Sequence, residues 1–224
     1  MSRDDLLRYA RDLGWRDVDL AGRVTPEVAL PDAARGRDAA LSAPDLASMS
    51  AALADCRLCR LSQGRTQVVF GAGSSSARVM FVGEAPGADE DRLGEPFVGR
   101  AGQLLNAMLR AIDLRREDVY IANVIKCRPP GNRDPQDDEV AACLPFLLAQ
   151  VERIDPPVIV TLGRVSYRHL TGSTAPISSY RGRWTTWRGR DLLPTFHPAY
   201  LLRNPAAKAQ AWIDLKALRR RLSA

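Results

Sequence analysis

Four short apolar runs, separated by stretches with helical periodicity, limit what this chain can fold into. The runs cover residues 79–82, 119–125, 158–162 and 192–196, and helical patterns cover 102–112, 135–154, 163–170 and 205–222. Strands that alternate with helices favour βαβ units, whose parallel strands are covered by helices on both faces. The sequence therefore predicts an α/β fold, with three α/β/α layers around a central, mostly parallel four-stranded sheet.

The first 45 residues differ from the rest of the chain. Residues 3–14 have an amphipathic helical pattern, with Ser2 as a suitable N-cap. Residues 22–45 are rich in Ala, Arg, Asp and Pro without a sustained period, which is typical of a linker or a tether to DNA or a partner. We expect an N-terminal helix and flexible arm over residues 1–45 and one domain over residues 46–224. Within that domain, Asp134 and Pro135 mark the start of the longest helix.

Charge and hydropathy narrow the class of protein. The 224 residues include 32 Lys and Arg against 26 Asp and Glu, a net charge of +6. This balance fits a polyanionic partner, although many proteins are mildly basic. No apolar stretch approaches the length of a membrane span, and the N-terminal residues are too polar for a signal peptide. We expect a cytoplasmic protein that acts as a monomer.

Residues capable of chemistry follow three of the apolar runs. The first run leads into a Gly-Glu-Ala-Pro-Gly turn over residues 83–87, the second contains Asn123, and His197 follows the last. In sheets of this type, ligands bind outside the carboxyl ends of the strands. The turn, the amide and the imidazole are therefore expected to meet on one rim of the sheet.

The four cysteines indicate a metal centre. Cys56 and Cys59 form a C-x2-C pair, and Cys127 and Cys143 follow at dispersed positions. In a reducing compartment, such cysteines favour metal ligation over disulfides. Structural zinc sites more often have two tight pairs, and dispersed thiolates suit a [4Fe–4S] cluster equally well. Four unrelated buried thiols are a weaker interpretation, because the C-x2-C pair lies in a polar, Arg-rich segment.

Five sequence blocks resemble the family 4 uracil-DNA glycosylases, in the order of that family. They are CRLC at 56–59 with GEAPG at 83–87, PFVGRAG at 96–102, NVIKCRPP at 123–130 and HPAYLLRNP at 197–205. The resemblance covers residues 50–222. It implies a [4Fe–4S] cluster on the four cysteines. It also implies an enzyme that flips uracil out of single- or double-stranded DNA and hydrolyses its N-glycosidic bond, leaving an abasic site.

The resemblance assigns roles to three residues. Phe97 becomes the platform on which the flipped base stacks, where it could otherwise be an ordinary buried aromatic. The Asn123 carboxamide can donate to uracil O4 and accept from N3–H, a pattern that cytosine reverses; otherwise it is a turn-capping residue. His197 can stabilise negative charge on uracil O2 as the bond breaks. The second histidine, His169, is interpreted as structural.

The group that activates water is less clear from the sequence. Other uracil glycosylases have an aspartate where this chain has Ala85. We expect Glu84 to orient the water and Glu90 to lie near uracil C5, where its bulk would exclude the methyl group of thymine. Both could instead be solvated loop charges. Glycine at positions 83 and 87 permits close approach, so that backbone N–H groups around Ala85 and Gly87 can contact the base.

Contacts with DNA are expected on two segments. Leu201, Leu202 and Arg203 follow His197 and suit a wedge that fills the gap left by a flipped base. Arg183 lies in a basic, Trp-containing segment, which is either a hairpin beside the DNA groove or a solvated hairpin with packed tryptophans. The other arginines of this segment are Arg181, Arg188 and Arg190, and its tryptophans are Trp184 and Trp187.

Three alternative functions remain at this point. One is a relative that crosslinks to DNA through a loop histidine, although residues 128–134 contain no histidine. Another is a glycosylase for deaminated purines. The third is a DNA-binding module without catalytic activity, which would be favoured if Asn123 and His197 lay far apart.

Overall fold

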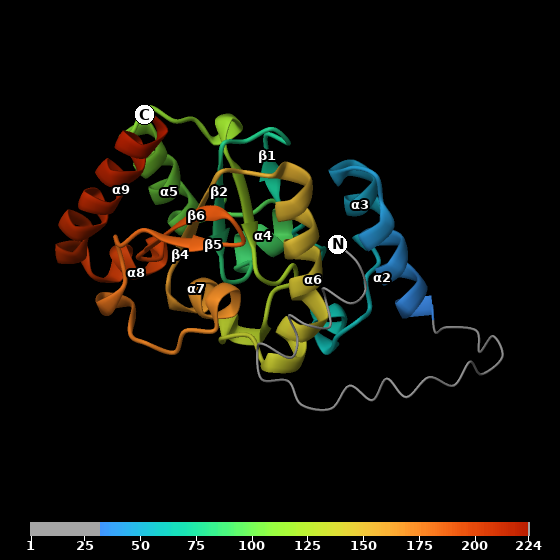
Figure 1. Cartoon of the computed structure of the whole chain (residues 1–224). Helices are drawn as coiled ribbons and strands as arrows, with labels where there is room; N and C mark the ends of the chain where they lie inside the picture. Colours follow the sequence, from blue (N-terminus) through green and yellow to red (C-terminus); the bar gives the residue numbers. More distant parts are fainter. Residues whose placement is uncertain (1–31, 224) are drawn as a thin grey trace. The chain divides into compact units, whose positions relative to one another are not determined.

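The computed structural model describes residues 32–223 (Figure 1). The helix predicted at residues 3–14, with its cap, lies outside the described residues. None of the described helices is long and apolar enough to cross a membrane.

The sheet has six strands in the order β1-β3-β2-β4-β6-β5. The strands are β1 (Ala72–Gly73), β2 (Val79–Gly83), β3 (Tyr120–Asn123), β4 (Val158–Leu162), β5 (Thr185–Trp187) and β6 (Arg190–Thr195). The four inner strands are parallel, which confirms the predicted core of the sheet. Strands β1 and β5 add antiparallel edges. These edges were not predicted, because two or three partly exposed residues leave no apolar run.

Helices connect and cover these strands. The helices are α2 (Asp32–Ser42), α3 (Leu46–Leu53), α4 (Ala88–Leu93), α5 (Arg100–Arg110), α6 (Asp137–Ile154), α7 (Arg164–Thr171), α8 (Pro198–Arg203) and α9 (Lys208–Leu222). The predicted N-cap at Asp134 is wrong. Helix α6 is capped at Gln136, whose N–H donates to the Glu139 carboxylate at 2.9 Å. The Asp134 carboxylate instead accepts from Arg164 at 3.1 Å.

The core lies on both faces of the sheet, since every residue of β2, β3 and β4 is buried. On one face, Phe81 and Ile121 belong to a cluster with Leu109 of α5 and Leu215 of α9. Figure 1 shows α5 and α9 on one side of the sheet and α6 on the other. Parallel strands buried in this way have nearly continuous apolar sequences, which is why they could be predicted.

Residues 32–42 form helix α2, although the sequence favoured an arm without regular structure for residues 22–45. Arg153 of α6 donates to the carbonyl oxygens of Leu41 and Ala43, at 2.8 and 3.1 Å. The arm interpretation is therefore wrong for this segment. Its composition misled because α2 packs on α3 and α6, through contacts that no local pattern encodes.

Candidate active site

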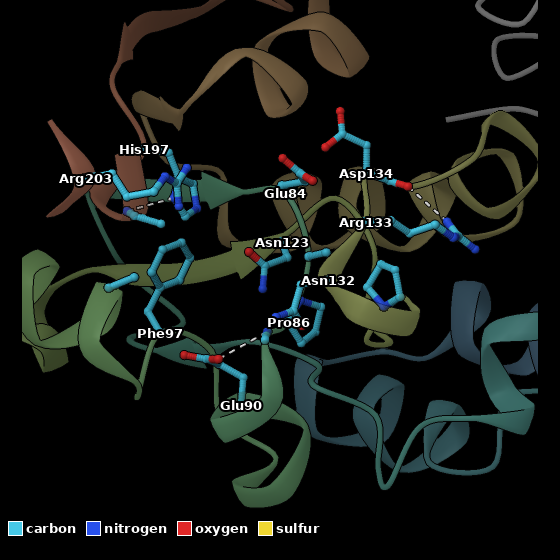
Figure 2. Close-up of a pocket in the computed structure, with 15 residues that line it drawn as sticks. Glu84, Pro86, Glu90, Phe97, Asn123, Asn132, Arg133, Asp134, His197 and Arg203 are labelled. Atoms are coloured by element: carbon cyan, nitrogen blue, oxygen red, sulfur yellow. Dashed lines mark hydrogen bonds between the residues drawn. The ribbon is translucent and has the colours of Figure 1, made fainter. Parts of the chain in front are cut away.

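A cavity of about 370 Å³ opens at the carboxyl ends of the parallel strands. Its walls are the turn after β2, the segment around Phe97, Asn123 at the end of β3, the loop over 129–134, and His197 with Arg203 (Figure 2). The glycine-rich turn, the amide and the imidazole therefore meet on one rim, as predicted. Asn123 and His197 line the same cavity. A wide separation of these two residues would have favoured a non-catalytic DNA-binding module, and the structure does not show such a separation.

Asn123 lies in the pocket with an unused acceptor. Its side chain is 1% exposed, and Oδ1 has no hydrogen-bond partner within the described part of the chain. Gly83 is the register partner of Asn123 on β2, and a Cβ atom there would lie 2.4 Å from Asn123 Oδ1 and 2.6 Å from the Phe97 ring. Glycine therefore allows the amide and the ring to approach each other. A buried, unpaired acceptor costs about 1–3 kcal/mol, which a ligand that donates a hydrogen bond can recover.

Phe97 presents its ring beside this amide. Its ring centroid is 5.5 Å from that of His197, with the planes tilted by 35°. Its backbone has φ of 54°, in the left-handed region that bulky residues seldom adopt. A strained conformation of this kind persists only where the surrounding structure holds it, and such residues gather at functional sites.

His197 is a neutral hydrogen-bond donor in this structure. It caps helix α8, and its Nδ1 accepts from the N–H of Ala199 at 3.1 Å. Burial, assisted by the positive charge of Arg203, lowers the pKa of His197 to about 4, although Glu90 opposes the shift. Because Nδ1 acts as an acceptor, the single proton of the neutral ring lies on Nε2. The residue therefore keeps one N–H donor across the physiological pH range.

Glu84 is a half-buried carboxylate in the turn after β2. Burial, together with the negative charge of Asp134, raises the pKa of Glu84 to about 7, and Arg164 opposes the shift. Such a group exchanges its proton near neutral pH, as a general base requires. Figure 2 shows Glu84 and Asp134 on the same side of the pocket.

Glu90 is fixed by backbone donors. Its carboxylate accepts from the N–H groups of Gly87 at 3.1 Å and of Val98 and Gly99 at 2.9 Å each. The side chain thus ties the start of α4 to the segment that carries Phe97. It lines the cavity in a fixed position, so it is not a freely solvated loop charge.

All four cysteines line a second, smaller cavity, between α3, α6 and the segments that follow α3 and β3. The Arg65 guanidinium donates to Cys127 Sγ at 3.4 Å, and the Lys126 N–H donates to Cys143 Sγ at 3.2 Å. Burial raises the pKa of Cys127 to about 11 and of Cys143 to about 12, so these thiols are neutral unless a metal displaces their protons.

The four cysteines can be compared with the donor set that an iron–sulfur cluster requires. Across residues 32–223, no group of three or more His, Cys, Asp or Glu side chains is arranged to hold one metal ion. A cluster of several irons is larger than one ion and takes one thiolate at each corner. Four cysteines around one cavity, with N–H donors to two sulfurs, meet that requirement.

Of the three residues predicted to form a wedge into DNA, one is buried and two are at least partly exposed. Leu201 is 1% exposed and packs in the core, so it cannot be a wedge. The short helix α8 packs on α5, and Leu201 belongs to the same apolar cluster as Leu105 and Leu109 of α5. Leu202 is half-buried, and Arg203 is exposed and lines the active-site cavity. The wedge prediction is therefore wrong for Leu201 and stays a prediction for the next two residues.

The basic hairpin is only partly available for DNA. Arg181 forms an ion pair with the buried Asp214, and Arg190 forms one with Asp155 at 2.7 Å. Trp187 is buried and donates to the carbonyl of Leu170 at 2.6 Å. Arg183 is exposed, so it is the arginine of this segment that best keeps the predicted role.

The loop over residues 129–134 is a part of the site that sequence reasoning missed. It contributes Asn132, Arg133 and Asp134 to the cavity wall. Arg133 is held by the fully buried Glu139 at 2.6 Å. A signal exists in the sequence, since the loop begins within the fourth sequence block, whose residues Asn123 and Cys127 are already assigned to the two sites.

Comparison with known proteins gives a consistent result. Residues 70–216 match the model of the uracil DNA glycosylase superfamily. A type-4 uracil-DNA glycosylase of Thermotoga maritima is 53% identical over 151 residues, which cover 66% of this chain and 79% of the relative. A type-4 uracil-DNA glycosylase of Sulfurisphaera tokodaii is 44% identical over 173 residues, 73% of this chain and 79% of the relative. A type-5 uracil-DNA glycosylase of Pyrobaculum aerophilum is 31% identical over 147 residues, which cover 58% of this chain and 64% of the relative.

Proposed function

Since this chain belongs to the type-4 uracil-DNA glycosylases, we propose that it flips uracil out of DNA and hydrolyses its N-glycosidic bond, leaving an abasic site. Flipping is required because the bond is inaccessible inside a duplex. The observation that carries the proposal is the buried Asn123 amide, with its unpaired Oδ1, beside the Phe97 ring.

Base recognition follows from these two residues. Uracil stacked on Phe97 offers N3–H to Asn123 Oδ1 and accepts at O4 from Asn123 Nδ2. Cytosine carries an acceptor and a donor at the same two positions, so it mismatches both contacts. Glu90, fixed by three backbone donors, supplies bulk where thymine carries its methyl group. Glycine at positions 83 and 87 and the backbone near Ala85 allow the close approach that this fit needs.

Bond cleavage relies on charge stabilisation. As the glycosidic bond lengthens, negative charge develops on uracil, mainly at O2. The Nε2–H of neutral His197 donates to that oxygen, and the bond strengthens as the charge grows, which is the requirement for catalysis. Glu84, once ionised, orients the water that attacks the sugar.

The rate is expected to rise with pH through the titration of Glu84. Its pKa of about 7 means that the ionised fraction increases between pH 6 and 8. His197 has a pKa of about 4 and stays neutral over this range. In single-turnover assays, Glu84→Gln should remove the pH dependence along with most of the rate. Asp134→Asn removes a like charge and should move the midpoint to lower pH; an unchanged midpoint would contradict this assignment.

We place a [4Fe–4S] cluster on Cys56, Cys59, Cys127 and Cys143. When bound, the cluster would crosslink the segment after α3, the segment after β3 and helix α6, and none of the proposed catalytic residues is among its ligands. Its role is therefore stability. The Arg65 guanidinium and the Lys126 N–H donate to the sulfurs and offset thiolate charge.

Anaerobically purified protein should contain about four irons per chain and absorb broadly near 400 nm. Cys127→Ser should lower the melting temperature and the iron content before it changes the chemistry at the pocket. The measurements are metal analysis and thermal unfolding. One zinc per chain without iron would contradict the cluster.

DNA is proposed to bind across the mouth of the pocket, with the protein acting as a cytoplasmic monomer. Arg203 at the rim and the exposed Arg183 are suited to phosphates, and the half-buried Leu202 is suited to fill the gap left by the base. Incubation with uracil-containing oligonucleotides, followed by alkali, tests the function. Strand cleavage at uracil supports it, and binding without an alkali-labile site would favour a non-catalytic module.

A further inference from the structure

The strained backbone at Phe97 needs an external brace, and two side chains of opposite charge provide one. The Glu90 carboxylate holds the N–H groups of Val98 and Gly99, on the far side of the ring-bearing residue. The Arg116 guanidinium donates to the carbonyl oxygen of Phe97 at 3.1 Å and to that of Pro96. These carbonyls belong to the two peptides on either side of the Phe97 Cα, so Arg116 contacts both peptide planes whose relative orientation defines the backbone conformation of Phe97.

Arg116 reaches this loop from the 3-10 turn that precedes β3, nearly twenty positions along the chain. Its side chain is 22% exposed, and within residues 32–223 the one carboxylate at ion-pair distance is that of the exposed Glu95, at 4.0 Å. Ion pairing is thus weak, and the carbonyls are its main partners. Helix α5 closes the remaining side, because a Cβ atom at Gly102 would lie 1.8 Å from the Phe97 oxygen.

We propose that Arg116 is a positioning residue for the base-stacking platform. Its planar fork bonds two successive carbonyls at once, which a lysine ammonium cannot do with the same geometry. By fixing the peptides before and after Phe97, it keeps the ring against Gly83 and Asn123, where the base must stack. The inference rests on the proposed function, since it names the residue that holds the uracil platform.

The test compares Arg116→Gln with Arg115→Gln. Arg115 is the adjacent arginine, 69% exposed, and its partners are Asp118 and Glu117 in the same turn, so the control removes an equal charge and disturbs the turn without touching the Phe97 loop. Arg116→Gln should lower the single-turnover excision rate about 10- to 100-fold, the scale of a small misplacement of a bound group. Inhibition by free uracil should weaken about 10-fold, while affinity for undamaged DNA stays within about 2-fold. Arg115→Gln should match the wild type.

Three results would overturn the proposal. The first is an Arg116→Gln variant that excises uracil, and is inhibited by free uracil, as the wild type is. The second is a loss of affinity for undamaged DNA as large as the loss of excision rate. The third is an equal effect of Arg116→Gln and Arg115→Gln. If Arg116→Gln does not fold, Arg116→Lys keeps the charge, and a rate within about 2-fold of wild type would reject the need for a fork.

Hydrogen exchange separates this proposal from the proposed function. The amides of Val98 and Gly99 should exchange faster in Arg116→Gln than in the wild type or in Arg115→Gln, whether or not the wild type releases uracil. Unchanged exchange would reject the brace. A wild type that releases no uracil, with faster exchange in the variant, would reject the function alone.

Discussion

Asn123→Asp should reduce uracil excision by at least about 10²-fold, because an ionised carboxylate only accepts hydrogen bonds. It can still accept from N3–H, but it repels O4 where the amide donated. The side chain keeps its size, so the loss reports hydrogen-bond matching. Weak cytosine excision should appear at acidic pH, where the protonated aspartate can donate to cytosine N3 while its other oxygen accepts from the amino group. The measurement is single-turnover excision from matched uracil and cytosine oligonucleotides.

Asn106→Asp provides the matched control for that experiment. Asn106 lies on α5, outside the pocket, and its Oδ1 is also buried without a partner among the described residues. The same chemical change there should leave the rate within about 3-fold of wild type, the usual scale for positions away from a site. If Asn123→Asp excised uracil at the wild-type rate, Asn123 would not be the reader of the base.

His197→Ala should lower the excision rate by about 10²–10³-fold with little change in DNA affinity, as for the loss of one donor to a developing anion. The variant also loses the acceptor that caps α8, at a cost of about 0.5–2 kcal/mol of stability. His197→Asn keeps a capping acceptor, so thermal unfolding of the two variants separates the cap from the catalysis.

His169→Ala is the control for the catalytic histidine. His169 lies in α7, outside the pocket, and its pKa is lowered by burial and by Arg168. Full single-turnover activity in His197→Ala would remove His197 from the mechanism.

Much of the fold could be predicted because buried parallel strands leave continuous apolar runs. The rim could be predicted too, since Gly83 and Asn123 end neighbouring strands and stand in register. Helix α2 could not be predicted, because its segment has the composition of a linker and is stabilised by tertiary contacts. Leu201 was misassigned because the sequence places it beside His197 but does not reveal which face of α8 packs on α5.

Contacts between distant parts of the chain were the least predictable. Arg116 bonds main-chain carbonyls about twenty positions away, and backbone acceptors leave no mark on the identity of their residues. The positive φ of Phe97 is equally hidden, because the sequence gives no glycine at that position. These features emerge only when the loop and its supports are seen together.

The most direct test of the account is a single-turnover comparison of DNA strands that differ only in one base: uracil, thymine or cytosine. The free base and the alkali-labile sites are counted in the same reaction. The account predicts free uracil and abasic sites in equal amounts from the uracil strand, and neither product from the other two. Release of thymine at a comparable rate, or binding of the uracil strand without release of the base, would contradict it.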